Sequence, residues 1–128
     1  MAALPRLCSA ILFLLCICLQ GGSQAAGAKC SLSSIIIKQA KTGALVEGKP
    51  EYEVTMTNAC NCPQSKVLVQ CYGLSSVLPV NPRSIRAVDD TNCIVKAGQP
   101  VVRGAPVKFK YAWMTPQDFP LVSSKISC

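Results

Sequence analysis

The chain has 128 residues, of which 50% are apolar, and its 13 Lys and Arg against 6 Asp and Glu give a net charge of +7. This length allows one domain, and the absence of histidine removes the usual partner of a catalytic serine or cysteine. We therefore expect a single non-enzymatic domain without a cofactor. The positive charge favours an acidic partner over nucleic acid, because no basic face of a strand carries interleaved aromatic residues.

The N-terminal segment has the pattern of a secretory signal peptide. Arg6 supplies the positive start, and the apolar run from Leu7 to Leu19 is too short to cross a bilayer of about 30 Å as a helix. Small residues then suit signal peptidase cleavage after Ala25, with cleavage after Ala28 as the alternative. We expect a signal peptide over residues 1–25, a secreted domain over residues 26–128, and no membrane span after cleavage; an uncleaved anchor is the weaker alternative.

The cysteines fit an exported chain. Cys8, Cys16 and Cys18 lie in the predicted leader, so the total of nine becomes an even set in the mature domain. An even set in an exported chain predicts three disulfides and no free thiol. The paired cysteines are expected to be Cys30, Cys60, Cys62, Cys71, Cys93 and Cys128.

The Cys60-x-Cys62 spacing has two interpretations. In an extended segment the two side chains point to opposite faces, so we expect them to form disulfides with different partners. The pairing beyond that point stays open. A zinc site is the weaker alternative, because the chain has neither histidine nor a second close pair of cysteines.

From Cys30 onward, the alternation of apolar and polar residues is typical of strands. The clearest predicted strands cover residues 34–38, 51–57, 66–72 and 107–111. Weaker strands are predicted over residues 77–80, 85–88, 94–96, 101–103 and 121–126, separated by turn residues such as Thr42-Gly43. About eight or nine short strands predict an all-β fold, a small antiparallel β-sandwich stapled by disulfides, with a small β-barrel as the alternative.

Two lysines alternate with apolar residues near the C-terminus. If Val107, Phe109 and Tyr111 face the core, Lys108 and Lys110 project from the opposite face, about 6 to 7 Å apart. We expect this pair to form a basic, receptor-binding patch. The residues expected to join it are Arg83, Arg86 or Arg103. The alternative is that the charge only keeps the protein soluble.

The few aromatic residues suggest a function of another class. Trp113 lies in a loop with Pro116 and Pro120, where it could contact a receptor, although lining the core is the commoner role of a lone Trp. A non-catalytic module that binds cell-wall polysaccharide would use Trp113, Tyr72 or Tyr111 to stack on sugars. A hydrolase inhibitor also fits the cysteines, but no motif supports it.

Several short motifs resemble the tapetum determinant family of plant secreted cysteine-rich proteins. Beside the spaced cysteines, they are Ile35-Ile36-Ile37-Lys38-Gln39, Gly48-Lys49-Pro50-Glu51-Tyr52-Glu53-Val54, Asn58-Ala59-Cys60, Asn81-Pro82, Asp90-Thr91-Asn92-Cys93, Gly98-Gln99-Pro100 and Phe109-Lys110-Tyr111-Ala112. The resemblance implies an apoplastic protein ligand for the ectodomain of a leucine-rich-repeat receptor kinase, acting in cell-fate specification in the anther and tapetum.

Overall fold

A computed structural model describes residues 29–128. The predicted signal peptide, both of its cleavage sites and its three cysteines lie outside this range. Within the described range, no helix is long and apolar enough to cross a membrane.

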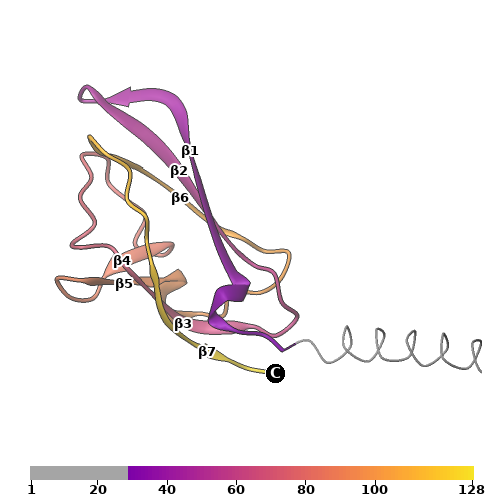
Figure 1. Cartoon of the computed structure of the whole chain (residues 1–128). Coiled ribbons are helices and arrows are strands. Elements are labelled where there is room, and N and C mark those ends of the chain that lie inside the picture. The colour runs from indigo at the N-terminus through magenta and orange to yellow at the C-terminus, as the bar shows by residue number, and fades with distance from the viewer. Residues whose placement is uncertain (1–28) are drawn as a thin grey trace, which may run out of the picture.

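The described chain forms two antiparallel sheets (Figure 1). The first has the strand order β1-β2-β6, formed by β1 (Ile35–Val46), β2 (Lys49–Asn58) and β6 (Val107–Ala112). The second has the order β4-β5-β3-β7, formed by β3 (Gln64–Gln70), β4 (Ile85–Ala87), β5 (Asn92–Val95) and β7 (Leu121–Ile126). Two short 3₁₀ turns complete the elements, η1 (Leu32–Ser34) and η2 (Lys96–Gly98). The predicted all-β sandwich is confirmed.

The clearest predicted strands are present, but two weaker ones are wrong. Residues 77–80 form no strand, and residues 101–103 contribute only a bridge between Val101 and Gln64. Pro79 accounts for the first, because it has no backbone N–H to donate to a ladder. The second goes no further than Val101 because a turn follows it, in which the N–H of Ala105 donates to the carbonyl of Val102 at 3.2 Å. The described range therefore holds seven strands instead of eight or nine.

The predicted turn at Thr42-Gly43 is also wrong, because these residues lie within β1. Between Lys41 and Leu45, β1 takes more residues than the facing part of β2, so the segment bulges, and Gly43 supplies a φ of +91°. The hydroxyl of Thr42 donates to the carboxylate of Glu51 across the bulge, at 2.7 Å. The chain reverses later, at Glu47 and Gly48, whose φ values of +49° and +76° suit a two-residue hairpin turn.

The inner faces of both sheets fill one hydrophobic core. Tyr111 and Phe119 are its largest fully buried side chains, and their rings meet edge to face with centroids 5.7 Å apart. The other buried apolar residues of this core are Ile35, Tyr52, Val54, Met56, Val67, Val69, Cys71, Ile85, Cys93, Val95, Val101, Val107 and Phe109. The core consists mainly of β-branched and aromatic side chains from segments that are distant in sequence, so it forms only when the two sheets meet.

All six cysteines of the described range are paired. The disulfides are Cys30–Cys60, Cys62–Cys128 and Cys71–Cys93, with Cα–Cα distances of 5.6, 4.8 and 5.8 Å. The prediction that Cys60 and Cys62 have different partners is confirmed. The disulfides Cys30–Cys60 and Cys62–Cys128 fasten the two ends of the domain to one loop. The third disulfide, Cys71–Cys93, is buried in the core.

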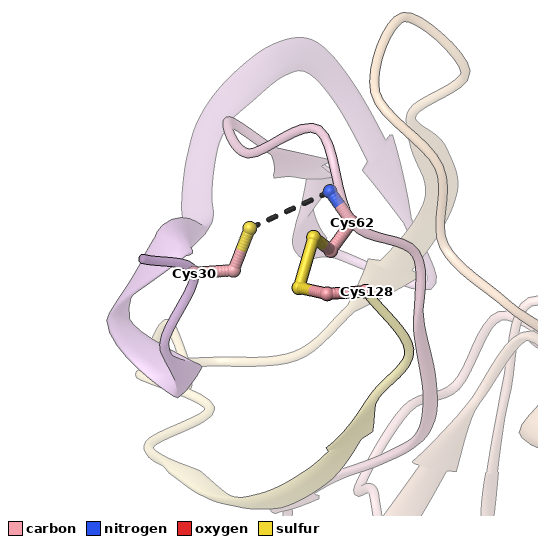
Figure 2. A group of neighbouring side chains, drawn as sticks. All are labelled: Cys30, Cys62 and Cys128. Atoms are coloured by element: carbon pink, nitrogen blue, oxygen red, sulfur yellow. Dashed lines mark hydrogen bonds between the residues drawn. A yellow bond between two sulfur atoms is a disulfide. The ribbon is translucent and has the colours of Figure 1, made fainter. Parts of the chain in front are cut away.

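The sulfur of Cys30 lies beside the Cys62–Cys128 disulfide (Figure 2). The sulfur atoms of Cys30, Cys62 and Cys128 are within 4.8 Å of one another, and the backbone N–H of Cys62 donates to the sulfur of Cys30 at 3.4 Å. Such a trio would hold a metal ion only as thiolates. In this structure, each of the three sulfurs is already part of a disulfide.

The loop that carries Cys60 and Cys62 is held by the buried side chain of Asn58. Its Oδ1 accepts a hydrogen bond from the backbone N–H of Cys60 at 3.0 Å, and its Nδ2 donates to the carbonyls of Cys62 and Val101, both at 2.9 Å. Both donors of the amide nitrogen are thereby used, and the amide oxygen accepts one hydrogen bond. Asn58 thus fixes the geometry in which the two cysteines reach different partners.

Replacing Asn58 with Ala should lower the free energy of unfolding by about 2 to 4 kcal/mol, because each polar group left buried without a partner costs about 1 to 3 kcal/mol. Chemical denaturation of the disulfide-intact protein measures this change. Gln99→Ala is the control, since Gln99 is an exposed amide residue away from this loop and its replacement should change the stability by less than about 0.5 kcal/mol. Equal stability of the two variants would contradict the role of Asn58.

Candidate receptor-binding surface

The outer face of the three-stranded sheet carries the predicted lysine pair. Val107, Phe109 and Tyr111 are buried while Lys108 and Lys110 are exposed, so the predicted alternation is confirmed. The two lysines lie opposite Thr55 and Glu53 of β2, respectively. They project from a polar sheet surface, not from a cavity.

Sequence reasoning missed a third lysine on this face. Lys38 of β1 is exposed and lies opposite Thr55 from the other side. Lys38, Thr55 and Lys108 therefore form one row across the sheet, and the Cα atoms of the two lysines are about 10 Å apart because neighbouring strands lie about 4.8 Å apart. The alternation in Ile35–Lys38 already placed Lys38 opposite the core, but only the strand register brings it beside Lys108. We call Lys38, Lys108 and Lys110 the basic face.

Acidic side chains moderate the charge of this face. Glu51 and Glu53 of β2 point to the same side of the sheet and are half-buried. Glu51 accepts the hydrogen bond from Thr42, and Glu53 lies opposite Lys110 in the strand register. The face thus has three lysines and two glutamates. Neither glutamate lies in the row of Lys38, Thr55 and Lys108, so this row is the most basic part of the face.

The three predicted arginines lie on other elements. Arg86 belongs to β4, at the edge of the second sheet, and Arg83 lies just before that strand. Arg103 lies in the loop before β6, where its guanidinium donates to the side-chain oxygen of Asn61 at 2.6 Å. All three are exposed, but none is part of the sheet that carries the lysines. A joint patch with the lysines stays a prediction.

Trp113 and Tyr72 line one cleft of about 390 Å³, together with Gln70, Ser75 and Asp118. Trp113 packs partly against the core, and the ammonium of Lys49 lies 6.0 Å from its ring centroid. Tyr72 is 68% exposed, and its hydroxyl lies 3.1 Å from the side-chain oxygen of Gln70. The cleft therefore combines two aromatic side chains with several polar groups.

Tyr111 cannot stack on a sugar, so its prediction as a sugar platform is wrong. It is fully buried, and its hydroxyl donates to Oε1 of Gln39 at 2.6 Å while accepting from the backbone N–H of Gln117 at 2.8 Å. Burial raises the pKa of this phenol, although the hydrogen bond from Gln117 acts the other way, so the group stays protonated and can donate.

The loop that forms one wall of the cleft is fixed from both sides. Gln39 of β1 donates to the carbonyl of Gln117, and the side chain of Gln117 donates to the carbonyl of Ser75 at 3.0 Å. Together with the Tyr111 hydroxyl, these bonds join the loop to β1 and to the segment after β3. These hydrogen bonds therefore hold one wall of the cleft in place.

Asp89 stabilises a turn on the second sheet. Its carboxylate accepts from the backbone N–H groups of Asn92 and Thr91 at 2.6 and 2.8 Å, and these bonds lower the pKa of Asp89. Asp commonly stabilises a turn in this way, by accepting hydrogen bonds from the backbone that follows it.

The chain is similar to one known family and to two relatives from plants. The family described as "Tapetum determinant 1, C-terminal" matches residues 31–128. "TPD1 protein homolog 1" of Arabidopsis thaliana is 36% identical over 109 residues, which cover 84% of this chain and 60% of that relative. "TPD1 protein homolog 1A" of Oryza sativa subsp. japonica is 32% identical over 85 residues, which cover 60% of this chain and 38% of the relative.

The chain thus spans less than two thirds of the length of these two relatives. No solved structure matches it. The family match nevertheless covers both sheets and five of the six paired cysteines, all except Cys30. The chain belongs to the Tapetum determinant 1 family.

Proposed function

We propose that this protein is a secreted ligand for the ectodomain of a plant leucine-rich-repeat receptor kinase, acting in cell-fate specification in the anther and tapetum. The observation that carries the proposal is the match of the Tapetum determinant 1 family to residues 31–128. The protein acts by binding and not as an enzyme.

Three disulfides in a small domain support secretion, because such bonds persist in oxidising compartments and are rare in the cytosol. The leader pattern of residues 1–25 agrees with export to the apoplast. Removing Arg6 with that leader leaves a net charge of about +6 on the mature domain.

The basic face is the proposed contact with the receptor. It is part of a sheet whose opposite side is buried, so its three lysines keep their spacing when a partner approaches. Charges that are exposed on a surface mainly speed association and set its salt dependence, while they add little to fold stability. An acidic patch on the receptor is the complementary partner surface.

Replacing Lys38, Lys108 and Lys110 together with Gln should slow association with the ectodomain about tenfold at low salt, because steering of this kind changes association rates by about 10-fold or more. Surface plasmon resonance against leucine-rich-repeat receptor ectodomains measures the rates. At high salt the difference should narrow, and the stability should change by less than about 0.5 kcal/mol.

A matched control removes the same amount of charge elsewhere, with the exposed residues Lys29, Lys66 and Lys125 replaced by Gln. If this control slows association as much as the basic-face variant does, net charge and not the basic face is responsible. If neither variant changes the rate, the receptor contact lies outside both sets of residues.

A second candidate function is a non-catalytic module that binds cell-wall polysaccharide. It rests on the cleft in which Tyr72 and Trp113 lie with Gln70, Ser75 and Asp118. Aromatic faces beside a few polar groups are typical of sites that take a compact, partly polar ligand.

For this second candidate, Tyr72→Ala should weaken retention on neutral wall glucans by up to about tenfold, because the loss of one aromatic contact costs about 0.5 to 1.5 kcal/mol. Affinity electrophoresis in gels that contain the glucan measures retention. Met114→Ala is the control, since Met114 is as exposed as Tyr72 but does not line the cleft. Wild-type protein that migrates freely through the glucan gel rules this function out.

A further inference from the structure

The outer face of the second sheet carries the largest hollow among those described here, with a volume of about 630 Å³. It is open to solvent and lies over β3, β5, η2 and β7. Its volume is in the range of small-ligand sites in proteins, about 300 to 1,000 Å³. It is separate from the basic face, which belongs to the other sheet, and from the cleft at Trp113.

A β-bulge brings Lys66 to this hollow. Between the pairs Ser65–Lys125 and Leu68–Ser123, β3 has one residue more than β7, and Lys66 takes a φ of +51° there. Gln64 and Val67 are buried while Ser65 and Lys66 both face outward. If the strand alternated strictly, the side chain of Lys66 would point to the core, as that of Gln64 does. The bulge turns the ammonium group of Lys66 to the outer face instead.

The floor of the hollow is apolar. Leu68 and Ile94 lie opposite each other on β3 and β5, and Ala97 and Gly98 of η2 adjoin them. Gly98 has a φ of +82°, and a Cβ at this position would lie 3.2 Å from Cδ1 of Ile94. Glycine therefore meets the backbone requirement and keeps this side of the hollow free of a side chain.

The charges around the floor have one sign. Lys66 and Lys125 are both exposed and both line the hollow, and none of its lining residues is acidic. Two ammonium groups beside an apolar floor match a ligand that has an anionic group at one end and an apolar body at the other. Burial of that body adds a hydrophobic contribution that a free inorganic anion would lack.

We propose that this hollow binds a small amphiphilic anion, that is, a carboxylate on an alkyl or aryl body. Lys66 and Lys125 contact the carboxylate, and Leu68, Ile94 and Ala97 contact the apolar body. The site does not depend on the proposed receptor function. Its two lysines, Lys66 and Lys125, are not part of the basic face.

The test is isothermal titration calorimetry of the disulfide-intact protein with decanoate below its critical micelle concentration. We expect saturable binding of one decanoate, at least tenfold weaker in Lys66→Gln/Lys125→Gln. The matched control is Lys108→Gln/Lys110→Gln, which removes the same charge from the other sheet and should bind as the wild type does. Decanol, which has the same chain without the carboxylate, should bind at least tenfold more weakly than decanoate.

Three results would each overturn the proposal: no saturable binding of decanoate by the wild type, equal loss of binding in both double variants, or equal affinity for decanol. Circular dichroism melting of each variant checks that the fold is retained. If Lys66→Gln/Lys125→Gln abolishes receptor association while decanoate does not bind to the wild type, the hollow is a protein-docking surface, and the ligand proposal fails while the receptor function stands.

Discussion

The buried amide of Asn58 is the interaction on which the arrangement of this domain most depends. It holds the N–H of Cys60, the carbonyl of Cys62 and the carbonyl of Val101 at the end of β2. Because Cys60 bonds Cys30 and Cys62 bonds Cys128, one short loop fastens both ends of the described chain. An apolar residue at position 58 would fill the space equally well but would leave the loop without a defined path.

This constraint leaves the two outer sheet faces free for binding. The core joins the inner faces, the third disulfide cross-links the second sheet from within, and the ends of the chain are tied at one place. The outer faces differ, since the first carries the basic face beside Glu51 and Glu53, and the second is hollowed where β3 bulges. Such a scaffold can hold two binding surfaces apart without a moving part, which suits a ligand that must meet a receptor in one orientation.

Alternation in the sequence was enough to predict the fold class, the strands around Val54 and Phe109, and the outward direction of Lys108 and Lys110. It could not predict Lys38 as their neighbour, because that contact depends on the register between β1 and β2 and not on any local pattern. The bulges at Gly43 and Lys66 could not be predicted from the sequence either, because a residue is extra only relative to the partner strand. Tyr111 was misjudged as a sugar platform for a similar reason: its hydroxyl is satisfied by Gln39 and Gln117, which only the fold brings near.

The proposed receptor contact is the basic face. Lysine-specific acetylation, followed by mass spectrometry with and without a bound leucine-rich-repeat receptor ectodomain, tests it most directly, because every lysine of the folded protein reports on its own exposure. The account predicts that Lys38, Lys108 and Lys110 lose reactivity in the complex while Lys66 and Lys125 keep theirs. Protection of Lys66 and Lys125 with the three lysines of the basic face still reactive would contradict it.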